Sequence, residues 1–255
     1  MPCQSMHNGF VLALLADIHG NLEALQACLA HARAAGARRY ALLGDVVGYG
    51  ADPAGVVDVA MGLAAGGAVV VKGNHDEAVG GDAGYLNRAA SEAIAWTRTA
   101  LSDAHRGFLA ALPLERRDAD AAYAHASLHQ PARWEYIDGP AAAYRCMDAA
   151  AMPYAFCGHI HDPQLFFESG PGRAVAFRPT PGTEIPVPRH RRWVAIPGSV
   201  GQPRDGDTRA AYALVDFARE RITFHRVAYD HLGVADKMER VGLPAALVHR
   251  MRRGV

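Results

Sequence analysis

The sequence has no excess of charge of either sign, because 26 lysines and arginines balance 26 aspartates and glutamates. Proteins that bind DNA, RNA or an anionic membrane surface usually carry a pronounced positive excess. We therefore do not expect a nucleic acid or a membrane as the partner. A small anionic ligand that is held locally is compatible with the balanced charge.

Cysteine is scarce in this chain, and no two cysteines form a C-x-x-C pair. A disulfide framework or a thiolate zinc site normally needs such closely spaced residues. The sequence excludes both, and we expect four reduced thiols, with Cys28 and Cys157 buried in apolar surroundings. The four lie far apart in the sequence, at Cys3, Cys28, Cys146 and Cys157.

Long hydrophobic runs are also absent. The apolar run at residues 10–16 has no basic segment before it and ends at Asp17, so it predicts a buried strand and not a signal peptide or a membrane span. We therefore expect a cytoplasmic protein. Hydrophobic residues make up 50% of the chain, which is enough for a substantial core. We expect a single domain over residues 1–255.

The N-terminal part of the chain repeats one pattern, in which an apolar run ends at glycine and aspartate or asparagine and a helical stretch follows. This alternation predicts parallel βαβ units. The carboxyl ends of such strands are where open α/β sheets bind ligands. The predicted strands are residues 10–16, 40–43 and 68–71, with helices after residue 22 and at residues 54–65.

The rest of the chain predicts more helices and a second sheet. Residues 86–112 show loosely helical spacing, and residues 121–126 and 154–157 resemble further strands that end at histidines. Residues 179–192 contain four prolines and predict an exposed loop. Strand-like segments after His161 predict a second, mostly antiparallel sheet, at residues 165–168, 174–178, 193–196, 211–217 and 221–227.

Oxygen and imidazole donors stand at five of the predicted strand ends. A single D-x-H or H-x-H pair is a weak signal, because alternate residues at a strand end share a face by chance. Five such ends in one chain indicate a metal site. Mixed oxygen and imidazole donors favour Mn, Fe or Zn over a calcium cage. The donors are Asp17, His19, Asp45, Asn74, His125, His159 and His161.

Two metal ions of such a site lie about 3.5–4 Å apart, and a shared carboxylate is the natural bridge between them. We expect Asp45 to be that bridge. The order D-x-H, G-D, G-N-H-D, a lone H and G-H-x-H resembles that of the calcineurin-like metallophosphoesterases over essentially the whole chain. The resemblance implies a metal-dependent phosphoric ester hydrolase. It also implies an α+β fold, a four-layered α/β/β/α sandwich in which helices flank two mixed β-sheets.

The resemblance further implies which residues hold two divalent metal ions. One ion would be bound by Asp17, His19, Asp45 and His161. The other would be bound by Asp45, Asn74, His125 and His159. The implied mechanism is attack on phosphorus by a hydroxide that bridges the metals, with no covalent intermediate. Ser127 and Ser199 belong to no recognisable Ser-His-Asp arrangement, so we assign them no covalent role.

The residues after Asn74 also have roles in this family. The resemblance implies that His75 contacts the scissile phosphate or protonates the leaving oxygen, and that Asp76 orients its imidazole. The alternative is that His75 and Asp76 make only a structural hydrogen bond in a turn. His129 is close enough in sequence to His125 to line the same pocket.

Two flanking segments resemble a bacterial and archaeal branch of small cytosolic phosphodiesterases. They are GDVVGYG at residues 44–50 and PGSVGQPR at residues 197–204. Within that branch we expect Tyr49 to stack on a base and Arg204 to clamp a non-scissile phosphate. The alternatives are an aromatic at the pocket rim for Tyr49, and for Arg204 an ion pair with Asp205 or Asp207.

The leading hypothesis is a phosphodiesterase acting on a small nucleotide-type phosphoester, such as a cyclic nucleotide or a dinucleoside polyphosphate. A phosphomonoesterase acting on a protein or a small molecule is the nearest alternative. A non-catalytic metal-binding scaffold of the same fold would lack ligands, whereas all seven positions and His75 are filled here. The neutral charge disfavours a nuclease.

The C-terminal segment is cationic and predicts a solvated helix end, at Arg250, Arg252 and Arg253. The metal pair and the oligomeric state stay open.

Overall fold

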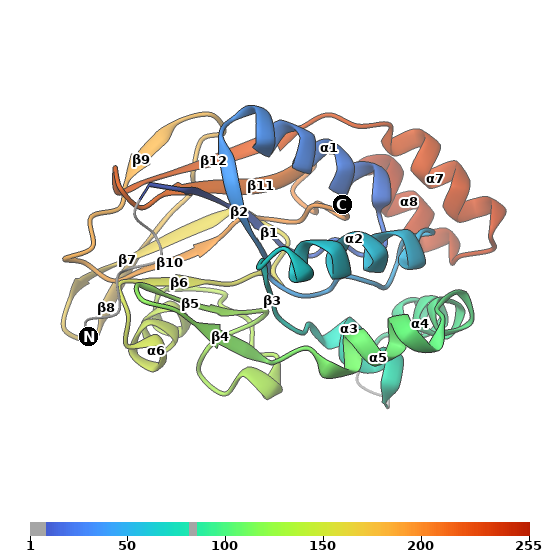
Figure 1. Cartoon of the computed structure of the whole chain (residues 1–255), viewed down its shortest axis with the longest axis horizontal. Helices are drawn as coiled ribbons and strands as arrows, with labels where there is room; N and C mark the ends of the chain where they lie inside the picture. Colours follow the sequence, from blue (N-terminus) through green and yellow to red (C-terminus); the bar gives the residue numbers. More distant parts are fainter. Residues whose placement is uncertain (1–8, 82–85) are drawn as a thin grey trace.

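The computed structural model describes residues 9–81 and 86–255. Two β-sheets face each other in the middle of the molecule, and helices cover their outer faces (Figure 1). The sequence predicted this four-layered α/β/β/α arrangement, and the prediction is confirmed.

Sheet A has six strands among the described residues, in the order β3-β2-β1-β11-β12-β9. The strands β1, β2 and β3 run parallel, as the βαβ pattern predicted, and β11, β12 and β9 extend the sheet in antiparallel fashion. Its strands are β1 (Val11–Leu15), β2 (Ala37–Leu42), β3 (Val69–Val70), β9 (Glu184–Pro186), β11 (Ala210–Asp216) and β12 (Arg221–Val227).

Sheet B is also mixed and has the order β4-β5-β6-β10-β7-β8. The strands β5, β6 and β10 are parallel, and the edges are antiparallel. Its strands are β4 (Glu115–Arg117), β5 (Ala121–Ala124), β6 (Tyr154–Phe156), β7 (Gln164–Gly170), β8 (Arg173–Phe177) and β10 (Trp193–Ile196).

Both faces of the central strands are buried, which explains why they read as continuous apolar runs. In β1, Leu12 and Leu14 pack between the two sheets with Tyr123 of β5. The intervening Ala13 and Leu15 pack on the other side, against α1 and α2. A third cluster fills the space between sheet B and α6. Three apolar layers therefore hold the four structural layers together.

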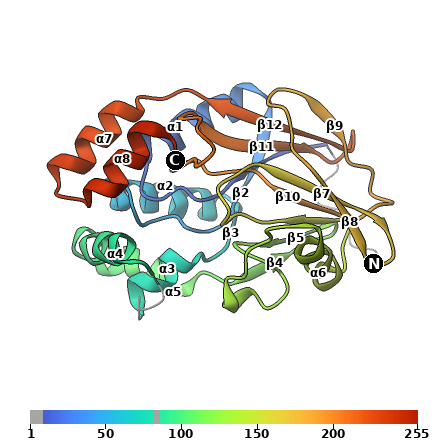
Figure 2. The same cartoon turned by 180° about the vertical axis from the view of Figure 1, so that it is seen from behind.

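The described residues form eight α-helices and one short 3₁₀ helix (Pro131–Arg133). Figure 2 shows α1 and α2 near sheet A, α6 near sheet B, and the other helices gathered at one end of the molecule. They are α1 (Leu22–Ala34), α2 (Pro53–Ala65), α3 (Asn74–Gly80), α4 (Arg88–Ala100), α5 (Asp103–Ala111), α6 (Pro140–Ala150), α7 (His231–Arg240) and α8 (Ala245–Arg253). The helices predicted within residues 86–112 are confirmed as α4 and α5.

Two sequence predictions about the C-terminal half are wrong. The strand segments after His161 do not form a sheet of their own, because β11, β12 and β9 join sheet A while β7, β8 and β10 join sheet B. The predicted loop at residues 179–192 contains β9, which pairs with β12 through Ile185 and its neighbours. A strand of three residues at a sheet edge is too short to show a periodicity, and Pro186 is tolerated there.

The described cysteines are Cys28, Cys146 and Cys157, and all three are free and buried. The Sγ atoms of Cys146 and Cys157 lie 3.8 Å apart. Cys3 lies outside the described residues. Among the described helices, none combines the length and the apolar character that crossing a membrane requires.

Candidate dinuclear metal centre

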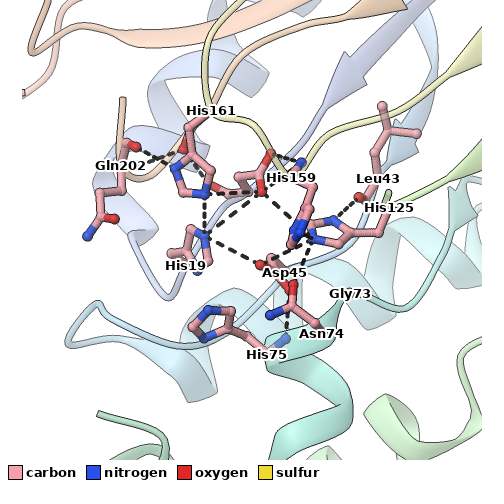
Figure 3. A network of polar contacts seen from close by, with 12 residues as sticks. His19, Leu43, Asp45, Gly73, Asn74, His75, His125, His159, His161 and Gln202 are labelled. Carbon is pink, nitrogen blue, oxygen red and sulfur yellow. Dashed lines mark hydrogen bonds and ion pairs between the residues drawn. The ribbon is translucent and has the colours of Figure 1, made fainter. Parts of the chain in front are cut away.

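All seven predicted metal-binding side chains meet in one cluster, although they come from five separate loops (Figure 3). Each follows a strand of the two sheets, so the facing sheets bring the loops after β1, β2 and β3 against those after β5 and β6. Every one of the seven is at most 8% exposed. Ionisable side chains are rarely buried to this degree unless they are paired or bind a metal.

Two groups of side chains could each hold one cation. Asp17, His19 and His161 have donor atoms within 4.8 Å of one another, and so do Asp45, His125 and His159. The Oδ2 atom of Asp45 lies between these groups, 3.6 Å from His19 Nε2 and 3.3 Å from His125 Nε2. Asp45 thus occupies the position that a bridging carboxylate requires.

Hydrogen bonds to the main chain fix the orientation of three imidazoles. His19 Nδ1 donates to the Val47 carbonyl at 3.2 Å, His125 Nδ1 to the Leu43 carbonyl at 2.8 Å, and His161 Nδ1 to the Gln202 carbonyl at 2.6 Å. A carbonyl oxygen only accepts, so each Nδ1 carries the proton. Each Nε2 therefore presents a lone pair to the cluster, as a metal-binding histidine must.

The inward-facing nitrogen and oxygen atoms of the cluster lie close to one another. His19 Nε2 and His161 Nε2 are 3.1 Å apart, and His125 Nε2 is 3.0 Å from His159 Nδ1 and 3.1 Å from Asn74 Oδ1. Acceptor atoms repel one another at such distances unless a proton or a cation lies between them. The donor set of carboxylate, amide and imidazole suits divalent ions such as Mn, Fe or Zn. The residues therefore fit two cations.

The electrostatics of the cluster are consistent with this fit. Burial raises the pKa of Asp17 to about 7, because the carboxylate is removed from water. Burial alone would lower the pKa of His125, but the carboxylates of Asp45 and Asp17 outweigh it and raise that pKa to about 9. Burial holds the pKa values of His19 and His161 well below the usual range, so both stay neutral. The buried carboxylates thus attract positive charge, which a proton supplies at His125 and which a bound cation would supply in its place.

Five of the seven side chains project from residues in the left-handed backbone region. This conformation is uncommon for residues other than glycine and often marks strain at a functional site. It turns the chain sharply at each strand end, so that consecutive polar side chains can point into one cluster. The φ angles are 54° for Asp17, 50° for His19, 50° for Asp45, 72° for His159 and 67° for His161.

The glycines before the ligands are required by close packing. A Cβ atom on Gly73 would lie 2.1 Å from Asp45 Oδ1, and one on Gly158 would lie 2.8 Å from Asp17 Oδ2. Real Cβ atoms do not approach other atoms so closely. The G-N-H-D and G-H-x-H patterns therefore include glycine because the ligand carboxylates pass directly over its main chain.

His75 lies beside the cluster, and its ring is 4.9 Å from that of His19 and 4.4 Å from that of Tyr49. Its main-chain N–H donates to Asp45 Oδ1 at 2.9 Å. Within residues 9–81 and 86–255, its Nδ1 has no hydrogen-bond partner. A Cβ atom on Gly48 would lie 2.5 Å from this Nδ1, so close packing against Gly48 positions the ring.

Asp76 was predicted to orient the imidazole of His75, but in the described structure its carboxylate accepts no hydrogen bond from that ring. The carboxylate instead accepts from the N–H groups of Gly73 at 2.9 Å and Val47 at 3.1 Å. Asp76 is in the first turn of α3, where a carboxylate satisfies main-chain donors that have no helical partner. The hydrogen bonds of Asp76 are therefore structural, whereas the catalytic role of His75 stays a prediction.

Tyr49 lines the pocket, but it is only 5% exposed. Its ring is 4.5 Å from His19 and 4.4 Å from His75, and the guanidinium of Arg204 lies 5.9 Å from its centroid. His19, His75 and Arg204 thus pack around a ring that borders the pocket, and the stacking of a base on Tyr49 stays a prediction.

Arg204 points into the pocket and does not pair with its sequence neighbours. Its guanidinium donates to Gln202 Oε1 at 3.1 Å. Asp205 pairs with Arg226, and Asp207 with Arg209 at 2.6 Å. The ion pair that the sequence left open as an alternative is thus absent among the described residues, and the charge of Arg204 is available to a ligand.

Comparison with known proteins identifies the family. A family model described as the calcineurin-like phosphoesterase superfamily domain matches residues 10–220. The chain belongs to this family. It is 32% identical over 252 residues to the uncharacterised protein MJ0912 of Methanocaldococcus jannaschii, an alignment that covers 96% of this chain and 98% of that protein. The family assignment made from the sequence is confirmed, and the protein is a phosphoester hydrolase.

Solved structures share the fold. The crystal structure of a metallophosphoesterase from Sphaerobacter thermophilus superposes with a TM-score of 0.86 at 36% identity, covering 97% of this chain and all of that one (100%). The crystal structure of the hypothetical protein PH1004 from Pyrococcus horikoshii OT3 gives a TM-score of 0.77 at 21% identity, with 96% and 99% coverage. At 21% identity, the likeness to PH1004 shows only that the two proteins share a fold.

The phosphoesterase has a pocket of about 420 Å³ next to the cluster. Seven of its lining residues were not predicted to be there, and four of these are aromatic or cationic: Arg133, Trp134, Tyr136 and Arg250. Three of them belong to the segment after β5, and the sequence signal was two aromatic residues and an arginine within four positions of each other. Arg250 comes from α8. His129 is not among the lining residues, contrary to expectation.

Tyr136 and Trp134 form one wall of the phosphoesterase pocket. The ring of Tyr136 stacks on that of His159 at 4.3 Å, and the residue is 55% exposed. The indole N–H of Trp134 donates to Glu77 Oε2 of α3 at 3.1 Å. The wall is thereby attached both to the metal cluster and to the helix that carries His75.

Proposed function

We propose that the protein is a phosphodiesterase that uses two divalent ions to hydrolyse a small nucleotide-type phosphoester. The observation that carries this proposal is the position of Asp45, whose Oδ2 lies between two sets of imidazoles with inward lone pairs. Mn, Fe and Zn are the proposed ions, and the cytoplasm is the proposed compartment. When bound, the ions would polarise the phosphoryl oxygens and activate a water molecule.

The residues of the chain would bind and orient the substrate. One metal would be held by Asp17, His19, Asp45 and His161. The other would be held by Asp45, Asn74, His125 and His159, so Asp45 would be shared between them. His75 is close enough to the cluster, at 4.9 Å from His19 between ring centroids, to reach the leaving oxygen of a phosphate bound there. We propose that its imidazole contacts the phosphate or donates the proton that this oxygen needs; because burial lowers the pKa of His75, the donor is the minor, protonated form of the ring. Arg204 lines the same pocket and would contact a phosphate oxygen.

The shape of the pocket supports a diester over a monoester. A monoester needs room for one organic group, whereas the 420 Å³ pocket extends from the cluster to both the Trp134–Tyr136 wall and Arg204. Aromatic side chains on such a wall stack on bases of any sequence. A nucleotide ester therefore fits the pocket better than a phosphorylated protein side chain.

Hydrolysis of bis(p-nitrophenyl) phosphate by metal-stripped protein, with and without added Mn²⁺, tests the proposal. Restored turnover that is lost in Asp45→Ala and kept in the exposed control Asp138→Ala would support it. A faster reaction with p-nitrophenyl phosphate would identify a phosphomonoesterase. Binding of two equivalents of metal, counted by calorimetry, without turnover of either ester would identify a non-catalytic scaffold.

A further inference from the structure

Two arginines from distant parts of the chain line the same pocket. Arg204 comes from the loop after β10, and Arg250 comes from the last helix, α8. The sequence predicted a solvated helix end around Arg250. The structure corrects this expectation, because Arg250 is half-buried at the pocket while Arg253 of the same helix is exposed.

Neither arginine has its charge balanced within the described chain. Arg252, their neighbour on α8, pairs with Asp236 at 2.9 Å and Glu239 at 2.8 Å. No carboxylate of residues 9–81 and 86–255 forms an ion pair with Arg204 or Arg250, and the partners of Arg204, Gln202 and the Tyr49 hydroxyl, are neutral. A partly desolvated guanidinium is costly unless an anion accepts its hydrogen bonds.

Both arginines lie in the pocket with Tyr49. The guanidinium of Arg204 lies 5.9 Å from the centroid of the Tyr49 ring, and Arg204 and Arg250 line the pocket together with Asp45 and His159 of the cluster. The two guanidinium groups therefore share one pocket with the metal cluster and the aromatic wall.

We propose that Arg204 and Arg250 form a second anion site, which binds the phosphate adjacent to the scissile one. The substrates are then nucleotide derivatives with two or more consecutive phosphates, and Arg250 determines this specificity. A cyclic nucleotide has one phosphate, which the metals would occupy, so it would leave both arginines without an anion. The inference rests on the proposed phosphodiesterase activity.

Hydrolysis of the bond between the two phosphates needs water as its only other reactant. The water oxygen forms a bond to the scissile phosphorus, the bond from that phosphorus to the bridging oxygen breaks, and the electron pair leaves with the adjacent phosphate. Negative charge therefore develops on the phosphate that Arg204 and Arg250 contact. Charge-assisted hydrogen bonds at this position would stabilise the leaving group as well as bind it.

The test compares a dinucleoside polyphosphate with the corresponding dinucleoside monophosphate and with bis(p-nitrophenyl) phosphate, all with Mn²⁺. We expect Arg250→Gln to lower kcat/KM for the polyphosphate about tenfold more than for the other two substrates. The matched control Arg253→Gln is expected to keep the wild-type values for all three. Equal losses on all substrates, or no loss on the polyphosphate, would overturn the inference.

A binding measurement separates this inference from the proposed activity. Calorimetry with Mn²⁺-loaded protein should show that ADP binds about tenfold more tightly than AMP, and that Arg250→Gln removes this preference. A preference that survives in Arg250→Gln contradicts the second anion site even if the enzyme is active. An inactive wild type with the preference intact would instead contradict the proposed phosphodiesterase alone.

Discussion

The Nε2 atoms of His19 and His161 lie 3.1 Å apart, although the two residues are separated by 142 positions in the sequence. Both imidazoles carry their proton on Nδ1, because each donates to a main-chain carbonyl. Two lone pairs therefore face each other in a fully buried site. This arrangement is unfavourable by itself and becomes favourable when a cation is shared, so metal binding should be coupled to the stability of the fold.

Gly73→Ala should lower the metal affinity of the site although it replaces none of the proposed ligands. The added Cβ would lie 2.1 Å from Asp45 Oδ1, so the carboxylate must move. We expect metal affinity to fall about 10- to 100-fold, as for other changes that disturb the residues around a ligand. Titration of the metal-stripped variant with Mn²⁺ measures this loss.

Gly62→Ala is the matched control for that substitution. A Cβ atom on Gly62 would meet nothing within 4 Å, and the residue is inside α2. We expect unchanged metal affinity and a gain of about 0.5–1 kcal/mol in the free energy of unfolding. Equal metal affinities of the two variants would show that the packing of Gly73 against Asp45 has no role in the site.

The convergence of the seven candidate ligands could be predicted from the sequence because these residues are tied to local signals. Each stands within a few residues of the end of an apolar strand, and the carboxyl ends of neighbouring parallel strands meet at one edge of a sheet. The glycine before Asn74 and the glycine before His159 added a second signal. Both signals are short in range, so they do not depend on how the sheets pack.

The contacts that were predicted incorrectly depend on longer-range packing or on competing local bonds. Strand alternation looks the same in either sheet, so the sequence could not assign β11 and β12 to sheet A. Asp76 follows His75 directly, yet the start of α3 directs its carboxylate to main-chain N–H groups. Arg250 reaches the pocket only because α8 packs against α7 and α4, which no local pattern shows.

Tyr136→Ala should weaken binding of a nucleotide ester if the aromatic wall holds a base. Stacking of a base on an aromatic side chain contributes about 1–3 kcal/mol, so we expect kcat/KM to fall about tenfold. Tyr136→Phe keeps the ring and should keep at least half of the wild-type value. Since Tyr136 also stacks on His159, both variants need a measured metal content. Identical kinetics of the Ala and Phe variants would exclude base stacking at this position.

His225 should make the stability of the protein depend on pH. Burial, with a smaller effect of His31, lowers the pKa of His225 from its ordinary 6.5 to about 4. Between these values the unfolded chain takes up a proton that the folded protein does not, so stability falls as the pH drops through this range. The Nε2 atom is buried and has no partner among the described residues, so it cannot easily accept a charge.

Thermal unfolding at pH 7.5 and pH 5 checks this dependence in wild type, His225→Gln and the exposed control His249→Gln. We expect the Tm of His225→Gln to fall less between the two pH values than that of wild type. The control should follow wild type. Parallel shifts in all three proteins would assign the loss of stability to other groups.

His75→Gln should affect catalysis according to the leaving group. If the imidazole donates a proton to the leaving oxygen, its removal costs about 10²- to 10⁴-fold in kcat with a poor leaving group and far less with p-nitrophenolate, which leaves without a proton. A series of aryl phosphodiesters with rising leaving-group pKa measures this dependence, with His129→Gln as the control because His129 does not line the pocket.

A steeper dependence of kcat on leaving-group pKa in His75→Gln than in wild type is the result that general-acid catalysis requires. A loss of kcat of equal size for every leaving group would instead mean that His75 contacts the phosphoryl group in the transition state without protonating the leaving oxygen. The two outcomes are separable here because His75 does not depend on Asp76 for its orientation. Its ring is held by packing against Gly48 and Tyr49, so replacing it should leave the bonds of Asp76 to Gly73 and Val47 in place.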